Sequence, residues 1–350
     1  MIRPRVWQVV AGLLVLTDLA SAGLARRAVP DIHVTYPQLI QPAIDAAPPG
    51  SRIIVGAGEY EEYLQIQTDG ISLIGRGAKL IPDVGRDPRN VCSDTAGDGR
   101  EAGICIASKE VRFAGFVEHA KVSSVGRPVK DVSVEGFVVR GFDGENIAIY
   151  GGQNTRISGN TLVDGEVYGV LSVASKNTRV ENNTIESTAT LKFIAICTDD
   201  YSGVRTTNNQ ISGHYIGLCL QTSHSLQQSN AITGCCTGAF VDAGKEGIKV
   251  LDNTIQGTDT RCGDWPFIGG IYLDGPKGTH VEGNTITGKR ANNQAFGVAI
   301  VDSSTVATNN QVKKNTFSDN DVDIVLLSTG SGNQIKNNEC TSSNPPGLCD

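Results

Sequence analysis

Charged side chains are scarce in this 350-residue sequence: 19% of the residues are Asp, Glu, Lys or Arg, and the formal net charge is −7. Basic clusters and arginine-rich runs are missing, which argues against a nucleic-acid partner, because phosphates are met by positive charge. Aromatic residues make up only 5% of the chain, so few rings are offered for ligand stacking. Glycine, with 41 residues, is plentiful and predicts many tight turns and few helices.

Long apolar runs are missing beyond the first residues, and no later stretch approaches the roughly 20 apolar residues of a membrane helix. Residues 1–22 have the pattern of a signal peptide: basic Arg3 and Arg5, an apolar run over residues 9–16, and a small-x-small cleavage site ending at Ala22. We therefore expect a secreted, extracellular protein with no membrane contact, whose residues 23–350 form one domain.

All nine cysteines lie after the predicted signal peptide, and most of them should pair in an oxidising compartment. An odd number leaves at least one thiol free or intermolecular. The sequon that starts at Asn182 predicts one glycan. The spacing suggests these pairs: Cys92 with Cys105, Cys340 with Cys349, and Cys262 with either Cys235 or Cys236.

A short pattern recurs along the chain: an apolar residue, two further residues, Asn, one residue and a second apolar residue. Its steps of 21 to 31 residues correspond to the coils of a parallel β-helix, in which each coil buries its apolar face only by stacking on its neighbours. We predict an all-β, single-domain, right-handed parallel β-helix (solenoid). Its asparagines should form an interior hydrogen-bonded ladder: Asn160, Asn183, Asn209, Asn230, Asn253, Asn284, Asn315 and Asn338.

A second element lies between successive asparagines, where a small residue precedes alternating apolar positions. Period-two alternation directs its second and fourth residues to the core and its third and fifth residues outward. The central coils should therefore carry thiols, rings and acids on one outer face. Its third positions include Cys197, Cys219, Phe240 and Tyr272, and its fifth positions include Tyr150, Asp199, Gln221, Asp242 and Asp274.

The ends of the solenoid need covers, because an open coil exposes its core and its strand edges. Apolar residues at helical spacing predict a capping helix from Pro37 to Ala47, which begins at Pro42 if the proline occupies the first turn. The segment 338–350 should cover the other end. Residues 82–131 interrupt the repeat, and we expect them to form a long excursion.

Two sequence stretches carry a resemblance to known proteins: Ile40 to Tyr60, which reads IQPAIDAAPPGSRIIVGAGEY, and Ile71 to Gly77, which reads ISLIGRG. They resemble the entry of the pectate-lyase-like superfamily. Over residues 36–349 the chain is similar to secreted right-handed β-helix repeat proteins of the periplasmic copper-processing (NosD-like) type. The resemblance implies the fold rather than one activity, since the superfamily includes lyases, hydrolases, esterases, epimerases and proteins of no known activity.

The predicted catalytic residues are Asp199, Asp242 and Asp274. Asp242 and Asp274 fall on adjacent coils, about 4.8 Å apart, so their charges should repel and separate the two pKa values into an acid and a base or nucleophile. The resemblance to pectate lyases also implies that stacked carboxylates hold Ca²⁺. The alternative is that these acids end strands by accepting hydrogen bonds from turn amides.

The predicted substrate-binding residues are Tyr150, Gln221, Phe240, Tyr272, Lys245 and Arg261. Lys245 and Arg261 lie in turns, where they either contact an anionic sugar or remain solvated. Cys197 and Cys219 would stack at a distance compatible with a disulfide, with a copper or redox role as the alternative. The acid-pair, histidine and lysine motifs of polygalacturonases are not matched, because His214 follows Asp200 by less than one coil.

Three functions follow from these features. The first is a carbohydrate-active enzyme, a polysaccharide lyase, hydrolase or epimerase that binds its substrate along one face of the solenoid. The second is a small-molecule isomerase or cyclase of specialised metabolism, in which an apolar pocket positions the substrate. The third is a non-catalytic binding or surface protein with an apolar contact face. We expect a monomer with a polysaccharide or small-molecule ligand.

Overall fold

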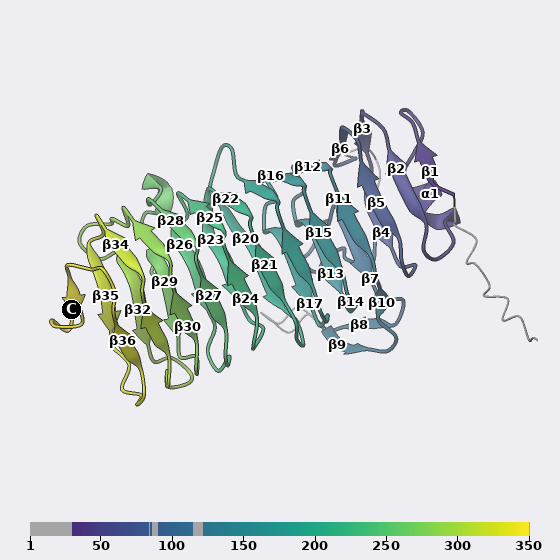
Figure 1. The fold of residues 1–350 in the computed structure, drawn as a ribbon. Helices are drawn as coiled ribbons and strands as arrows, with labels where there is room; N and C mark the ends of the chain where they lie inside the picture. Colours follow the sequence, from purple (N-terminus) through teal and green to yellow (C-terminus); the bar gives the residue numbers. More distant parts are fainter. Residues whose placement is uncertain (1–29, 84, 86–89, 115–121, 350) are drawn as a thin grey trace, which may run out of the picture.

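The computed structural model describes residues 30–83, 85, 90–114 and 122–349. These residues form one elongated solenoid, with its N-terminal coils at one end and its C-terminal coils at the other (Figure 1). The predicted signal peptide, residues 1–22, lies outside the described residues. No helix of the described part of the chain is long and apolar enough to cross a membrane.

Three parallel sheets form the sides of the solenoid, as the repeat predicts. We call them sheets A, B and C. Sheet A has twelve strands in the order β1 (Ile32–Val34), β2 (Arg52–Val55), β5 (Ser72–Gly75), β11 (Ser133–Glu135), β15 (Arg156–Ser158), β18 (Arg179–Glu181), β21 (Arg205–Thr207), β24 (Leu226–Gln228), β27 (Lys249–Leu251), β30 (His280–Glu282), β33 (Gln311–Lys313) and β36 (Gln334–Lys336).

Sheet B has ten strands: β3 (Gly58–Glu61), β6 (Ala78–Ile81), β12 (Val138–Arg140), β16 (Thr161–Val163), β19 (Thr184–Glu186), β22 (Gln210–Ser212), β25 (Ala231–Thr233), β28 (Thr254–Gln256), β31 (Thr285–Thr287) and β34 (Thr316–Ser318). Sheet C has eleven: β4 (Leu64–Ile66), β7 (Ile104–Ala107), β13 (Glu145–Tyr150), β17 (Tyr168–Val173), β20 (Lys192–Asp199), β23 (His214–Leu220), β26 (Thr237–Val241), β29 (Gly269–Asp274), β32 (Phe296–Val301), β35 (Val322–Leu326) and β37 (Ser343–Asn344).

The core is a stack of aliphatic side chains, because each strand places the same kind of residue at the same register. In sheet C, Ile147 pairs with Val170, which pairs with Ile196, and none of the three is more than 1% exposed. Burying such a side chain contributes about 1.5–3 kcal/mol, so the repeated column stabilises every coil in the same way.

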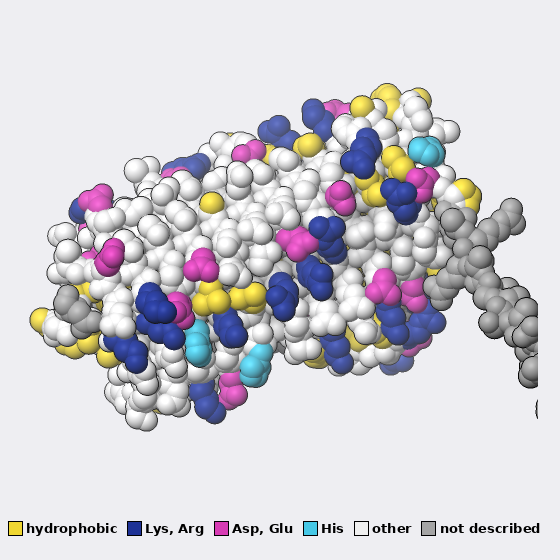
Figure 2. Space-filling view, viewed as in Figure 1, with side chains coloured by type: hydrophobic (Ala, Val, Ile, Leu, Met, Phe, Trp, Pro, Cys, Tyr) yellow, Lys and Arg dark blue, Asp and Glu magenta, His cyan; other side chains and the backbone are white. Residues whose placement is uncertain are grey.

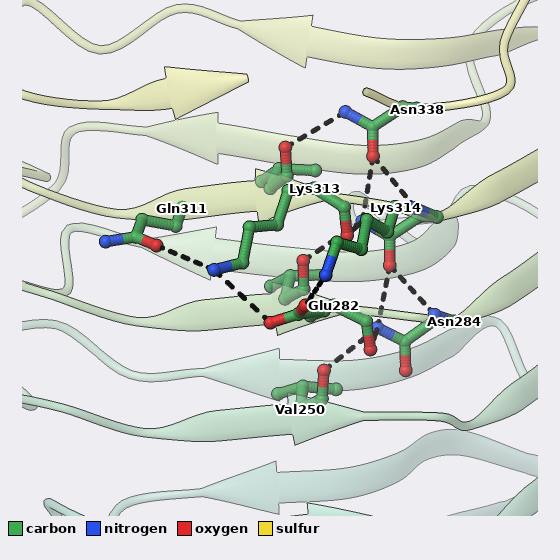
Figure 3. A network of polar contacts seen from close by, with 10 residues as sticks. Val250, Glu282, Asn284, Gln311, Lys313, Lys314 and Asn338 are labelled. Carbon is green, nitrogen blue, oxygen red and sulfur yellow. Dashed lines mark hydrogen bonds and ion pairs between the residues drawn. The ribbon is translucent and has the colours of Figure 1, made fainter. Parts of the chain in front are cut away.

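The predicted asparagine ladder runs through the turns between sheets A and B. Asn284 Nδ2 donates to Asn315 Oδ1 at 2.9 Å, and Asn315 Nδ2 donates to Asn338 Oδ1 at 3.0 Å (Figure 3). Asn284 Nδ2 also donates to the Val250 carbonyl at 2.9 Å, which satisfies a backbone group of the preceding coil. The residue before each ladder asparagine has a φ between 52° and 70°, and this left-handed residue makes the tight turn.

The second element begins with a small residue because neighbouring coils approach each other closely at that position. A Cβ atom on Gly270 would lie 2.4 Å from the Gly297 carbonyl oxygen, and one on Gly238 would lie 2.6 Å from the Gly270 carbonyl oxygen. Both distances are too short for an L side chain, so glycine recurs at this position for a steric reason.

The N-terminal cap is shorter than the predicted helix over residues 37–47. Helix α1 spans Gln41–Ala46, with Pro42 in its first turn, where its missing N–H costs no hydrogen bond. Ile40 and Ile44 are buried, but Leu39 is 45% exposed, so the apolar face does not extend to the start of the predicted segment. At the other end, strand β37 pairs with β35, and a disulfide joins Cys340 to Cys349.

The excursion predicted over residues 82–131 is divided by one strand of sheet C, β7, which pairs with both β4 and β13. The predicted Cys92–Cys105 disulfide ties the first loop to β7. The second loop contains an antiparallel pair, β8 (Val111–Phe113) and β9 (Val122–Val125), which is visible below the solenoid in Figure 1. It returns through β10 (Val129–Lys130), which pairs with β14 (Gly152–Gln153).

Candidate functional site

A cleft of about 630 Å³ lies on the outer face of sheet C. Its floor is formed by the central strands β17, β20, β23 and β26, where the outward residues predicted from the alternation are located. We define the cleft by its lining: Ala96, Arg100, Glu166, Val167, Tyr168, Leu191, Phe193, Ile194, Tyr215, Ile216, Cys219, Gln221, Phe240, Asp242, Trp265 and Phe267.

The floor of the cleft is apolar. Cys219 lies on it and forms a disulfide with Cys197, which stands in register with it on the neighbouring strand. Both half-cystines are 3% exposed and are packed with Leu171 and Ile216 in a cluster outside the solenoid core. The disulfide predicted for this pair is confirmed, so these two sulfur atoms are not free thiols for a copper site.

Aromatic rings gather along the cleft, although the sequence predicts few for this face. The Phe240 ring centroid lies 5.1 Å from that of Tyr272, and the Tyr215 centroid lies 5.0 Å from that of Trp265. Phe193 on β20 is 39% exposed and lies 6.4 Å from Trp265, centroid to centroid. We call the following rings the aromatic cluster: Tyr168, Phe193, Tyr215, Phe240, Trp265, Phe267, Tyr272 and Phe296.

Trp265 and Phe267 come from an insertion, residues 257–268, that precedes β29. The insertion contains the short 3₁₀ helix η1 (Thr260–Cys262) and is joined to the start of β26 by the Cys236–Cys262 disulfide. The Trp265 indole N–H donates to Thr237 Oγ1 at 3.1 Å. These links hold both rings against sheet C, so the rings form a fixed wall of the cleft.

A polar row runs along the carboxyl ends of the same strands. Gln221 and Asp242 line the cleft on adjacent coils, because the Asp242 N–H donates to the carbonyl of Leu220 at 3.2 Å. One coil before Gln221, Asp199 Oδ1 lies 3.8 Å from Lys245 Nζ in an ion pair. Lys245 is therefore neutralised by a residue that the sequence places in the same predicted site.

Asp274 continues this row beyond Asp242, since the two acids directly follow the paired residues Val241 and Leu273. Burial raises the pKa of Asp274 above its ordinary value, although a hydrogen bond from Ser303 opposes the shift. Burial and the charge of Asp274 together raise the pKa of the Tyr272 phenol. The carboxyl group of Asp274 thus holds its proton more tightly than an ordinary Asp.

Two residues of the predicted site lie elsewhere. Tyr150 is fully buried, because the segment that carries Phe113 covers the N-terminal coils and places the two rings 5.1 Å apart. Its hydroxyl lies 3.4 Å from Glu145 Oε1, inside the protein, so the prediction that Tyr150 contacts a substrate is wrong. Arg261 is held by Asp259, with 2.6 Å between Nη2 and Oδ2, and is not among the lining residues.

The sequence predictions missed most of the cleft. Of the nine predicted residues, Gln221, Phe240 and Asp242 line it, and Tyr272 stacks on Phe240 at its side. Glu166 was not predicted because it lies in the turn before β17. Phe193 and Tyr215 were not predicted because they lie at the amino ends of β20 and β23, ahead of the five-residue pattern. The long step between Asn253 and Asn284 was the available signal, since it marks the insertion that carries Trp265.

Several buried ionisable groups lie beneath this face. Burial raises the pKa of Asp200 to about 6, and burial lowers that of His214 to about 4. Lys289 is completely buried, and its ammonium donates to the carbonyls of Cys235 (2.8 Å) and Gly257 (2.7 Å). These groups bond to the protein itself, so we assign them to the fold and not to the cleft.

Within residues 30–349, as far as they are described, no group of three or more His, Cys, Asp or Glu side chains is arranged to hold a metal ion. The carboxylates of the polar row are therefore not gathered into a group of that kind. No step of the proposed function is assigned to a metal.

Residues 192–344 match the family model described as periplasmic copper-binding protein (NosD). No curated protein sequence matches the chain significantly. Among solved structures, the chain is similar to an alginate lyase from Paenibacillus sp. str. FPU-7, with a TM-score of 0.57, 14% identity and coverage of 86% of this chain and 99% of the lyase.

Two further structures show the same architecture. The tailspike protein of E. coli bacteriophage HK620 in complex with a pentasaccharide has a TM-score of 0.55 and 14% identity, over 82% of this chain and 55% of the tailspike. XylC in complex with xylose has a TM-score of 0.54 and 11% identity, over 83% of this chain and 69% of XylC. The chain is therefore a right-handed parallel β-helix, and its residues 192–344 are similar to the NosD family.

Proposed function

We propose that this protein is a secreted carbohydrate-active enzyme that binds a glycan in the cleft and hydrolyses it with Asp242 and Asp274. One observation carries the proposal: the aromatic cluster and the row of carboxylates meet at Phe240, Tyr272, Asp242 and Asp274. Rings offer a flat apolar surface for the C–H face of a sugar, and carboxylates accept hydrogen bonds from its hydroxyls.

The charge of the cleft favours an uncharged glycan. Among the lining residues described, Arg100 is the basic one, and its guanidinium donates to the Asp143 carbonyl at 2.6 Å. Lys245 and Arg261, which would have contacted an anionic sugar, are paired with Asp199 and Asp259. A polyuronate would bring further negative charge beside the Glu166 and Asp242 carboxylates.

The chemistry follows from the two adjacent acids. Neighbouring strands are about 4.8 Å apart, which is close to the roughly 5–5.5 Å between the carboxyl groups of a retaining glycosidase. Asp274, whose pKa is raised by burial, is suited to protonate the leaving oxygen. Asp242, which lines the cleft, is then the nucleophile that forms the glycosyl intermediate, and water later hydrolyses this intermediate.

Similar solved structures support a glycan ligand for this protein, and the disulfides support a location outside the cytosol. The structures named above include a lyase of alginate, a tailspike with a bound pentasaccharide and a protein with bound xylose. Four disulfides suit an oxidising compartment outside the cytosol, in agreement with the predicted signal peptide.

The test uses Trp265, because it is the only tryptophan after residue 22 and lines the cleft. Neutral oligosaccharides such as xylo-, gluco- and manno-oligomers should change its fluorescence, whereas alginate and polygalacturonate oligomers should bind more weakly. Products are then followed as reducing ends and as absorbance at 235 nm. We expect reducing ends without unsaturated products, and their loss in both Asp242→Asn and Asp274→Asn.

The control is Asp252→Asn, which changes an acid in a turn between sheets A and B, away from the cleft. Unchanged turnover in both cleft variants would overturn the hydrolase. Unsaturated products would show a lyase instead, and binding without turnover would show a binding protein.

A small-molecule enzyme is the second candidate, and it is favoured by the apolar side of the cleft. Leu191, Ile194 and Ile216 line this side, and they would suit an apolar substrate better than a sugar. This candidate predicts that no glycan changes the Trp265 fluorescence, while an apolar ring compound competes with a fluorescent apolar dye for the cleft.

A further inference from the structure

Sheet A carries a row of basic side chains on a side of the solenoid that does not contain the cleft. The first residues of β15, β18, β21 and β27 are Arg156, Arg179, Arg205 and Lys249. Parallel pairing places them in one register column, with Leu226 of β24 between the last two. We call these four cations the basic row. The coil repeat brings them together from distant parts of the sequence, and none of them lines the cleft.

Strand alternation turns the basic row outward. Val180 and Thr206 are the middle residues of β18 and β21, and both are 0% exposed. The residues on either side of them therefore point to solvent. Arg179, Arg205 and Lys249 are all exposed, and basic side chains lie close together on this face in Figure 2.

Most of the basic row is not neutralised by neighbouring acids. Arg156 is paired, since its Nε lies 2.5 Å from Glu181 Oε1. Within the described residues, no ion pair involves Arg179, Arg205 or Lys249. The third residues of the same strands form the second outward column, and they include one acid: Ser158, Glu181, Thr207, Gln228 and Leu251.

This arrangement differs from that of the C-terminal coils of the same sheet. There, Lys313 and Lys314 pair with Glu282 at 3.3 and 2.9 Å. Arg179 and Arg205 instead stand opposite each other on neighbouring strands, where like charges repel. An anion that binds both guanidinium groups would remove this repulsion, so the row favours a negatively charged ligand.

We infer that the basic row is a second binding site, which holds a linear polysaccharide that carries a carboxylate on each sugar. Such a polyuronate, laid along the solenoid axis, offers a series of carboxylates to a series of cations. The row extends over four strand spacings, or about 19 Å. A guanidinium such as that of Arg179 or Arg205 can hold one carboxylate through two parallel N–H···O bonds. Leu226 and Leu251, both half-buried, offer apolar contact to the C–H faces of the sugars.

The charge of the whole protein favours a polyuronate over a nucleic acid. Duplex DNA carries one negative charge per about 1.7 Å of its axis, far denser than cations on strands about 4.8 Å apart. The net charge of −7 would repel such a polymer from the rest of the surface. The inference goes beyond the proposed function, because a neutral glycan in the cleft and a polyuronate on sheet A occupy different sides of the solenoid.

The test measures the binding of polygalacturonate oligomers to the full protein by calorimetry, at low and at high sodium chloride. We expect binding that weakens as salt screens the charges. The emission of Trp265, which lines the cleft on sheet C, should stay unchanged as polygalacturonate binds.

Variants locate the site on the basic row. Arg179→Gln combined with Arg205→Gln should weaken polygalacturonate binding roughly tenfold and make it less sensitive to salt. The matched control, Lys313→Gln with Lys314→Gln, removes the same charge from paired cations of the same sheet and should keep the wild-type affinity. Arg179→Lys with Arg205→Lys keeps the charge but loses the guanidinium fork, so its affinity should be intermediate. Unchanged denaturation midpoints check that the variants are folded.

Four results would overturn the inference. An equal loss in the Gln variant and its matched control would show a general attraction to charge, and a shift of Trp265 emission would place the polyuronate in the cleft. Equally tight binding of duplex DNA at the same salt would show a nucleic-acid site. The absence of any polygalacturonate binding would remove the second site and leave the cleft, which is tested with neutral oligosaccharides, unaffected.

Discussion

Asn230 donates its side-chain amide to Asn253 Oδ1 at 3.0 Å inside the solenoid, although 23 residues separate the two in sequence. The side-chain oxygen of Asn230, Oδ1, accepts a hydrogen bond in turn from the backbone N–H of Asn209 at 3.0 Å. Each ladder residue thus bonds three coils together, and both its donor and its acceptor are satisfied away from water.

Removing one member of the ladder should destabilise the whole solenoid. Asn230→Ala leaves the Thr206 carbonyl without the donor that Asn230 supplies and the Asn209 backbone N–H without its acceptor, and each orphaned buried group costs about 1–3 kcal/mol. The side chains of Asn209 and Asn253 each lose one hydrogen bond as well. We expect a clear drop in the midpoint of chemical denaturation. Asn208→Gly, at an exposed left-handed turn position next to the ladder, is the matched control and should change little.

Asp200 should make the protein less stable as the pH rises through weakly acidic values. Its carboxylate accepts from Ser172 and Thr178, yet burial dominates and raises its pKa from 3.8 to about 6. A raised pKa means that the folded state holds the proton more tightly, so this stabilisation is full below pH 3.8 and is lost as the pH passes 6.

The measurement is the free energy of unfolding from pH 3.5 to 7 for wild type and Asp200→Asn. The difference between them should change by on the order of 3 kcal/mol across this range. Comparison of the two proteins cancels the opposite contribution of His214, whose lowered pKa of about 4 costs stability as the pH falls below 6.5. A constant difference would contradict the assignment.

We expect Lys289 to make the folded protein more stable as the pH rises in alkaline solution. Burial lowers its pKa from 10.5 to about 8, so the folded state releases the proton more easily, and stability should rise between pH 8 and 10.5. Lys289→Met should remove this rise and cost stability at pH 10.5, because the Cys235 and Gly257 carbonyls lose their donor. Cys235→Ala serves as the control for the neighbouring thiol, whose pKa is raised to about 11 by burial.

Loss of the Cys236–Cys262 disulfide should change ligand binding in the cleft more than it changes the fold of the solenoid. The double variant Cys236→Ser/Cys262→Ser frees the insertion, so the emission of Trp265 should shift to the red and glycan affinity should fall roughly tenfold, or about 1.4 kcal/mol. The far-ultraviolet circular dichroism should remain that of a β protein. Replacing Cys340 and Cys349, at the C-terminal end, should leave Trp265 emission unchanged.

The face formed by sheet A carries both basic and acidic side chains (Figure 2). Pairs such as Lys313 and Lys314 with Glu282, at 3.3 and 2.9 Å, show how neighbouring coils balance their charges (Figure 3). On this face Arg156, Arg179 and Arg205 stand in register on adjacent strands, and Arg156 Nε lies 2.5 Å from Glu181 Oε1.

The sequence by itself was sufficient to predict the repeating coil of the solenoid. Residues such as Asn183 and Gly238 recur because each coil repeats the same turn and the same close approach to its neighbour, so a local pattern is enough to predict sheets, ladder and core. The alternation also located Gln221, Phe240 and Asp242 on the outer face of sheet C, because side-chain direction in a strand depends only on parity.

Only the tertiary structure decided which of these residues meet in a cleft. Trp265, Tyr215 and Phe193 come from three different coils and converge because a disulfide folds one insertion back over its neighbours. Cys236 pairs with Cys262 because it faces outward, whereas adjacent Cys235 faces the core. Tyr150 faces outward by the same strand alternation as Asp242, yet a loop from elsewhere in the chain covers it. Contacts of this kind depend on the paths of the loops, which no local repeat encodes.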